Sequence, residues 1–123
     1  MEINLDFDGT VVLHTFPDID PTDIGAEKVL KDLVDKGHRL ILFTMRSDEY
    51  LHDAVKWFSD RNIPLYGVQT NPTQHKWTNS PKSYAPIMID DSALGCPLVH
   101  PDEGRPYVDW VKIRKLLVER KVL

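Results

Sequence analysis

The chain has 123 residues, the length of one ordinary domain, and we expect a single domain over residues 1–123. Hydrophobic residues make up 41% of the sequence and charged residues 28%, which excludes a disordered or fibrous chain. The formal net charge of −4 argues against a nucleic-acid partner, because such domains usually carry a basic face. Cys96 is the single cysteine, so no intramolecular disulfide can form. Without a signal-peptide pattern or a membrane-length apolar run, the sequence predicts a cytoplasmic protein with no membrane partner.

The first half of the chain predicts two strands and two helices in alternation. Ile3 and Leu5 alternate with polar residues and indicate a first strand that ends where the acidic cluster begins. The continuous apolar run 40–43 is typical of a parallel strand buried on both faces, and this second strand is expected to end at Thr44. Apolar residues at helical spacing predict a helix before this strand, closed by Gly37, and another after it, capped by Ser47 or Asp48.

The second half predicts shorter strands and one more helix. Residues 65–68 and 87–89 indicate a third and a fourth strand, and 97–99 can add a short fifth. Between them, residues 69–85 show no periodicity and carry several Pro and Asn residues, so we expect a long loop. Asp109 is placed to cap a last helix whose expected inward residues are Trp110, Ile113, Leu116 and Leu117.

Alternating strands and helices predict an α/β fold with a parallel central sheet, and we expect a Rossmann-like three-layer α/β/α sandwich. In open sheets of this kind, ligands bind beyond the carboxyl ends of the strands. Asp6, Thr44 and Asp90 are each expected at such an end. The sequence therefore predicts a polar cleft along one edge of the sheet.

Two carboxylates separated by one residue, Asp6 and Asp8, open this cleft, and Gly9 permits the sharp turn that follows. Neighbouring carboxylates either raise one pKa or recruit a cation such as Mg²⁺. One carboxylate can attack phosphorus, and the other can protonate the leaving oxygen and later activate water. Phosphoryl transfer also needs positive charge and hydroxyl or amide donors around the phosphate. Side chains of these types occur at Thr10, Thr44, Lys82 and Asp90.

The segment Asp6-Phe7-Asp8-Gly9-Thr10 resembles the D-x-D-G-T motif of the haloacid dehalogenase (HAD) superfamily of phosphatases. Thr44 matches the second motif of that superfamily, a hydroxyl residue that binds the phosphoryl group. The pair Asp90-Asp91 matches the fourth motif, and a lysine upstream of it matches the third. Lys82 is favoured for that lysine over Lys76. No gap between the motifs is long enough for a cap domain, so the resemblance implies a small capless member.

The resemblance also implies the role of each residue. Asp6 and Asp90 would bind Mg²⁺ through their side chains and Asp8 through its main-chain carbonyl, while Asp91 would orient ligands or water. Lys82 would neutralise the nucleophile and the phosphate. Candidates for binding the phosphate or the leaving group are Gly9, Thr10, Thr44, Arg46 and Lys82. Two interpretations of Arg46 stay open, since it can bind substrate or be an exposed side chain near the start of a helix.

The sequence thus predicts a Mg²⁺-dependent phosphomonoester hydrolase that forms an aspartyl phosphate on Asp6 and uses Asp8 as general acid and base. Its expected partner is a phosphorylated substrate, either a small molecule or the end of a macromolecule. The oligomeric state stays open. The alternative is a phospho-acceptor or phosphate-binding signalling module without efficient turnover. Of the five histidines, only His14 is expected near the cleft.

Overall fold

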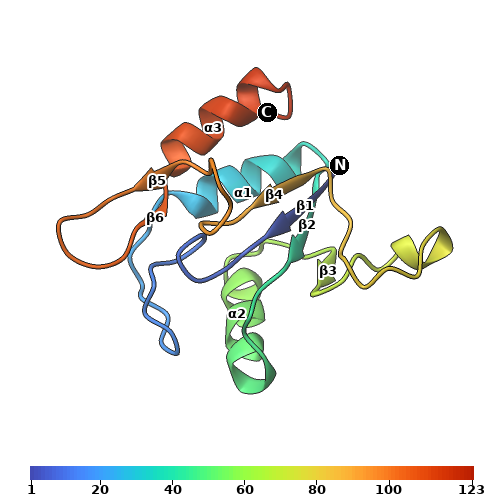
Figure 1. The fold of residues 1–123 in the computed structure, drawn as a ribbon, viewed down its shortest axis with the longest axis horizontal. Coiled ribbons are helices and arrows are strands. Elements are labelled where there is room, and N and C mark those ends of the chain that lie inside the picture. Colours follow the sequence, from blue (N-terminus) through green and yellow to red (C-terminus); the bar gives the residue numbers. More distant parts are fainter.

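This computed structural model describes residues 1–123. Four parallel strands form one sheet in the order β3-β2-β1-β4 (Figure 1). The strands of this sheet are β1 (Glu2–Leu5), β2 (Arg39–Leu42), β3 (Gly67–Val68) and β4 (Ile87–Ile89). The helices are α1 (Ala26–Asp35), α2 (Asp48–Asp60), the 3-10 turn η1 (Gln74–Lys76) and α3 (Trp110–Glu119). The α/β class and the parallel sheet are therefore confirmed, and the arrangement is compatible with a Rossmann-like fold.

The helix ends follow from local backbone chemistry. Gly37, just past α1, has a φ of 90°, a conformation that glycine adopts without a steric penalty. Asp109 caps α3 as predicted, because its Oδ1 accepts the N–H of Lys112 at 3.1 Å. Ser47 is the N-cap residue of α2, although its side chain makes no capping hydrogen bond. None of the helices is long and apolar enough to cross a membrane.

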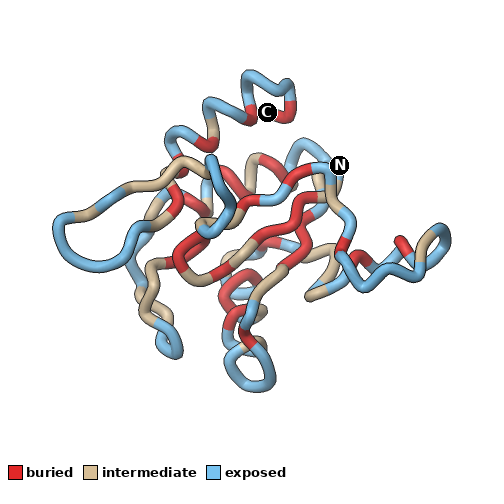
Figure 2. The backbone as a smooth tube through the Cα atoms, in the orientation of Figure 1, coloured by how far each residue is buried: buried red, intermediate tan, exposed pale blue.

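All three helices pack on the same face of the sheet. Ile3 is aligned with Leu40 and Ile87, and these side chains belong to a single core of 22 buried residues that includes residues of α1, α2 and α3 (Figure 2). Right-handed crossovers that advance in one direction along a sheet, as from β1 through β2 to β3, place their helices on one face.

The opposite face of the sheet carries no helix, which differs from the predicted three-layer sandwich. Asn4, Ile41 and Met88 point to this face, because side chains alternate along a strand. Residues 69–86 cover part of it: Asn4 Nδ2 donates to the carbonyl of Ser83 at 2.9 Å, and Ser83 Oγ donates to Asn4 Oδ1 at 3.0 Å. In Figure 1 the loop that carries η1 extends away from all three helices. Its Pro and Asn residues explain why only the short 3-10 turn η1, and no α-helix, forms there.

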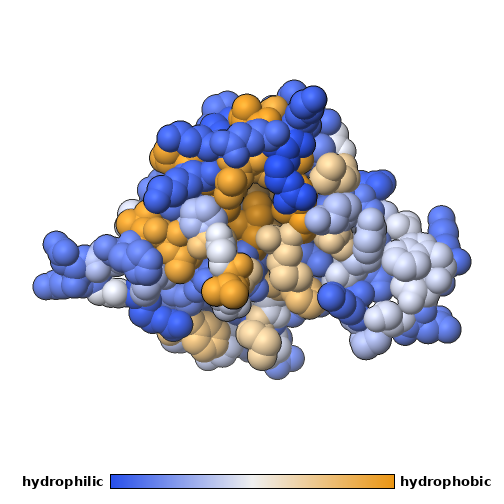
Figure 3. Space-filling view, turned by 45° about the horizontal axis from the view of Figure 1, so that its top comes forward, coloured by the Kyte–Doolittle hydropathy of each residue, from blue (hydrophilic) through white to orange (hydrophobic).

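Other sequence expectations are corrected in detail. The short fifth strand exists, but β5 (Leu98–Val99) pairs antiparallel with β6 (Tyr107–Val108) in a separate sheet. The second strand ends at Leu42 rather than Thr44. Leu116 is 41% exposed and not inward. It lines a groove with β4 and residues 93–97, and Figure 3 shows apolar side chains around a hollow beneath α3.

Candidate active site

Three carboxylates meet at the carboxyl edge of the sheet. Asp6 follows β1, and Asp90 and Asp91 follow the neighbouring strand β4. The N–H of Asp6 donates to the carbonyl of Ile89 at 3.0 Å, which continues the pairing of the two strands up to the acids. One oxygen from each of the three carboxylates lies within 4.8 Å of the others. We call Asp6, Asp90 and Asp91 the acid cluster. It lies where the chain reverses its direction along the sheet, the usual place for a ligand in such folds.

Hydroxyl and imidazole groups fix the acid cluster. Thr10 Oγ1 lies 2.8 Å from Asp6 Oδ2 and 3.3 Å from Asp91 Oδ1, and it accepts the N–H of Asp91 at 3.0 Å. His14 Nε2 lies 2.7 Å from Asp91 Oδ2, which confirms the expectation that His14 is near the cleft. Asp90 is held by Ser92, whose N–H and hydroxyl both donate to Asp90 Oδ1. The acids therefore have defined orientations.

Burial and hydrogen bonds shift the pKa values of Asp6 and Asp91 in opposite directions. Burial raises the pKa of Asp6 from 3.8 to about 7, and a hydrogen bond with Asp91 and the charge of Asp90 act in the same direction. Burial alone would also raise the pKa of Asp91, but hydrogen bonds from His14 and Asp6 outweigh it and hold that pKa below its usual value. In the absence of a cation and below about pH 7, the cluster thus holds one proton, mainly on Asp6.

The loop after β1 is held by backbone contacts and by a residue from α3. The carbonyl of Phe7 accepts the N–H groups of Thr10 and Val11, which forms a tight turn. Gly9 has a φ of 78°, and a Cβ on this residue would lie 1.8 Å from His14 Nε2. Glycine is therefore required here, both for the turn and for the approach of the imidazole. Trp110 Nε1 donates to the carbonyl of Thr10 at 2.7 Å, which ties α3 to the loop.

Asp8 does not point into the acid cluster, contrary to our expectation, but pairs with Arg46. Arg46 Nε donates to Asp8 Oδ2 and Nη2 to Asp8 Oδ1, both at 2.8 Å, which is a bidentate ion pair. Arg46 is 3% exposed, and its guanidinium also contacts main-chain carbonyls and lies between the rings of Phe7 and Phe16. The interpretation of Arg46 as an exposed side chain is therefore wrong. Binding of substrate by Arg46 stays a prediction, and it would require the guanidinium to release Asp8.

Thr44 and the two candidate lysines are not joined to the acid cluster. Thr44 lies two residues beyond β2, where its Oγ1 accepts the N–H of Arg46 at 3.2 Å and its main chain pairs with the amide of Gln69. Lys82 and Lys76 are exposed, and neither makes an ion pair in the structure. The choice between these lysines therefore stays a prediction, as does the contact of Thr44 with phosphate.

The donor set of the acid cluster fits a hard cation. Three carboxylates offer oxygen ligands, which Mg²⁺ prefers, and the imidazole of His14 contacts Asp91. The carbonyl oxygen of Asp8 accepts no hydrogen bond from the protein, so it is free to serve as the predicted main-chain ligand. The difference from the expected ligand set is Asp91, which lies in the cluster itself instead of only orienting ligands around it.

One relative of this chain has a solved structure. No protein-family model and no curated protein matches the chain. A solved structure from Bacteroides thetaiotaomicron, described as that of a conserved protein, shares 35% sequence identity over 98% of this chain and 91% of its own length, with a TM-score of 0.77. The chain belongs to the family of this conserved protein. Its family thus shares the fold described above over nearly the full length of both members.

Sequence reasoning missed the partners of several site residues. The pairing of Arg46 with Asp8 spans 38 positions, and the contact of His14 with Asp91 spans 77. Neither separation leaves a periodic signal in the sequence. The one local hint is Gly9. A glycine leaves room for another group to approach the main chain closely, and in the structure this group is the imidazole of His14.

Proposed function

We propose that this protein is a Mg²⁺-dependent phosphomonoester hydrolase of the HAD type, without a cap domain, that forms an aspartyl phosphate on Asp6. The observation that carries the proposal is the acid cluster, in which Asp6, Asp90 and Asp91 bring three oxygens within 4.8 Å of one another at the carboxyl edge of the sheet. The resemblance of residues 6–10 to the D-x-D-G-T motif supports it independently. The substrate is a phosphorylated small molecule or macromolecular end, and the protein acts in the cytoplasm.

The first half of the reaction is a displacement at phosphorus. Asp6 attacks phosphorus, the bond from phosphorus to the leaving oxygen breaks, and that oxygen takes a proton from Asp8. The contact with Thr10 presents Asp6 in a fixed orientation. Bound Mg²⁺ would supply positive charge to the carboxylates and the phosphate oxygens. Such charge matters because Asp6, with its pKa near 7, is otherwise only partly ionised at neutral pH.

The second half releases phosphate from Asp6. Asp8 takes a proton from a water molecule, the water oxygen attacks phosphorus, and the bond from phosphorus to Asp6 breaks. To act as the acid of the first step Asp8 must carry a proton, which the second step returns to it from water. For either step, Asp8 must also exchange at least one of its two hydrogen bonds with Arg46 for one to the leaving oxygen or to water. Arg46 therefore sets the position from which Asp8 acts.

The experiment that tests this proposal is a phosphomonoesterase screen in the presence and absence of Mg²⁺. Purified wild type should release inorganic phosphate from at least one class of phosphomonoester, EDTA should abolish the release, and added Mg²⁺ should restore it. Asp90→Asn should weaken the response to Mg²⁺, while Asp60→Asn, on the surface of α2, serves as a matched control. Full activity in excess EDTA, with no metal in the protein, would overturn the proposed site.

A second candidate function, a phospho-acceptor module, is favoured by the ion pair of Asp8 and Arg46. With both of its oxygens bound to Arg46, Asp8 is not available to activate water, and a phosphoryl group on Asp6 would persist. The lifetime of the phosphorylated protein separates the two functions. Turnover faster than the decay of isolated phosphoprotein favours the hydrolase, whereas a single stoichiometric phosphorylation with slow decay favours the acceptor module.

A further inference from the structure

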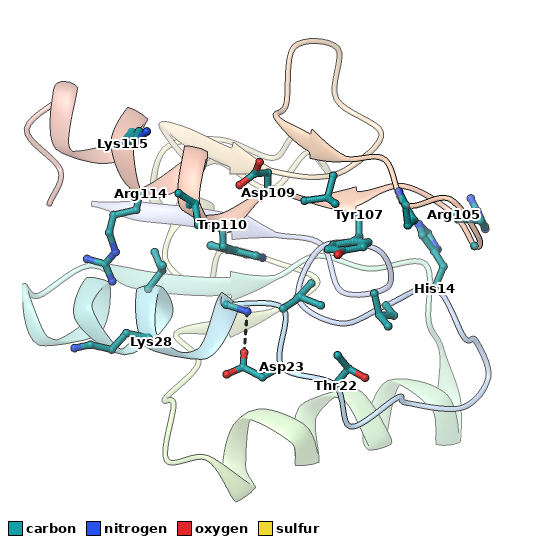
Figure 4. A pocket seen from close by; sticks show the side chains of 18 of the residues that line it. His14, Thr22, Asp23, Lys28, Arg105, Tyr107, Asp109, Trp110, Arg114 and Lys115 are labelled. Carbon is teal, nitrogen blue, oxygen red and sulfur yellow. Dashed lines mark hydrogen bonds between the residues drawn. The ribbon is translucent and has the colours of Figure 1, made fainter.

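A large cavity lies beside the acid cluster (Figure 4). Its volume is about 1090 Å³, and its walls come from residues 13–15, the start of α1, β6 and α3. Cavities that bind small molecules usually measure about 300–1,000 Å³. The space is therefore much larger than a phosphoryl group alone requires, and the chain's own side chains leave it open.

Two residues connect the cavity to the acid cluster. His14 lines the cavity, and its Nε2 lies 2.7 Å from Asp91 Oδ2. Trp110 also lines the cavity, and its Nε1 donates to the carbonyl of Thr10, whose hydroxyl contacts Asp6. A ligand in the cavity is thus one side chain away from the cluster. This proximity suits a group attached to the phosphate rather than an unrelated ligand.

The lining favours an uncharged ring system. Figure 4 shows Tyr107 and Trp110 along one side of the cavity and Lys28 and Asp23 on another. Aromatic side chains bind flat ring systems through large apolar contact and defined stacking geometry. Tyr107 is partly exposed and supplies most of this contact, because Trp110 is only 2% exposed. Among the lining residues, four basic side chains are matched by four acidic ones, so the cavity has no net charge that would select an ionic ligand. Val111 is 71% exposed and leaves apolar surface at its rim.

We propose that this cavity binds the leaving group of the substrate, and that the leaving group is an alcohol built on an uncharged aromatic or heteroaromatic ring system. The inference rests on the proposed hydrolase function. The phosphate would lie at the acid cluster, and the ring would extend past His14 toward Tyr107 and Trp110. After transfer of the phosphoryl group to Asp6, the protonated alcohol leaves from the cavity.

A binding experiment tests the cavity without any need for turnover. 1-Naphthol serves as the probe, and the indole N–H signals in two-dimensional NMR of the full chain are the readout. The signal of Trp110 should shift and saturate, while that of Trp77, which is 64% exposed and does not line the cavity, should not. Absence of a saturable shift at Trp110, or an equal shift at Trp77, would overturn the cavity as a ring-binding site.

A variant experiment then connects the cavity to the substrate. Val111→Arg places a charged chain at the mouth of the cavity, and Leu116→Arg places one on the same helix outside it. Val111→Arg should lower the ratio of kcat/KM for 1-naphthyl phosphate to that for acetyl phosphate by about tenfold, since apolar contact with the ring is lost. Leu116→Arg should leave this ratio unchanged. An equal ratio in wild type and Val111→Arg would overturn the leaving-group assignment while the hydrolase proposal stands. Naphthol binding without hydrolysis of any phosphate would overturn the hydrolase and with it the assignment of the ring as leaving group.

Discussion

Replacing Asp6 by Asn should stabilise the metal-free protein at alkaline pH. Between about pH 4 and pH 7 the folded protein keeps a proton on Asp6 that the unfolded chain has released, because the pKa of Asp6 is raised from 3.8 to about 7. The folded state therefore binds more protons, and stability falls as the pH rises through this window. Asn cannot ionise, so the variant escapes this loss.

The magnitude follows from the size of the pKa shift. One pKa unit corresponds to about 1.4 kcal/mol, so the full shift of Asp6 would amount to about 4 kcal/mol. Because Asp6 is only partly buried, solvent screens part of this energy, and we expect about 2 kcal/mol. Urea unfolding in EDTA measures this difference in the free energy of unfolding. At about pH 8 the urea concentration at the midpoint should be about 1 M higher for Asp6→Asn than for wild type. Near pH 4 the two midpoints should coincide.

Asp32 provides a control of opposite sign. Hydrogen bonds from Lys28 and Arg114 lower the pKa of Asp32. Its carboxylate stabilises the fold above the unfolded-state pKa, and this contribution is lost as the pH falls through the folded-state pKa. Asp32→Asn should therefore destabilise at neutral pH and not in acid. A difference between wild type and Asp6→Asn that does not change from about pH 4 to pH 8 would refute the account of the acid cluster.

Three further changes test separate parts of the structure. Arg46→Lys should lower kcat by about 10- to 100-fold without a matching rise in KM, as measured by steady-state kinetics. The reason is that lysine cannot form the bidentate pair that positions Asp8. Lys82→Ala should impair turnover more than Lys76→Ala, and the reverse order would transfer the third motif to Lys76. Asp109→Ala should cost about 1 kcal/mol in thermal or urea unfolding, since it removes the cap of α3, and an unchanged midpoint would contradict this role.

The strands and helices could be predicted because their signals are local. Alternating Ile3 and Leu5 indicated β1, and the cap residue Asp109 indicated the start of α3. The placement of the acids at strand ends followed from the same pattern, which is why Asp6 and Asp90 were predicted to meet. Each of these inferences depends only on spacing within a short window.

The layers and the pairing of side chains could not be predicted, because they depend on contacts between distant segments. We expected helices on the face of the sheet that bears Asn4. Part of this face is instead covered by the loop that contains Ser83, which contacts Asn4 although the two residues are 79 positions apart in the sequence. The same applies to Asp8, which was expected beside Asp6. A buried arginine elsewhere in the chain binds its carboxylate more favourably than a site already crowded with negative charge.

Detection of a phosphoenzyme tests the central claim most directly. The protein is mixed with Mg²⁺ and an activated aryl phosphate, quenched rapidly in acid, and examined by intact mass and peptide mapping. We predict a phosphoryl group on Asp6 in wild type and none in Asp6→Asn. In Asp8→Asn the group should still form on Asp6 but accumulate, because loss of the general base slows hydrolysis by about 10²- to 10⁴-fold. A phosphorylated peptide that maps to Asp8, or labelling that persists in Asp6→Asn, would contradict the account.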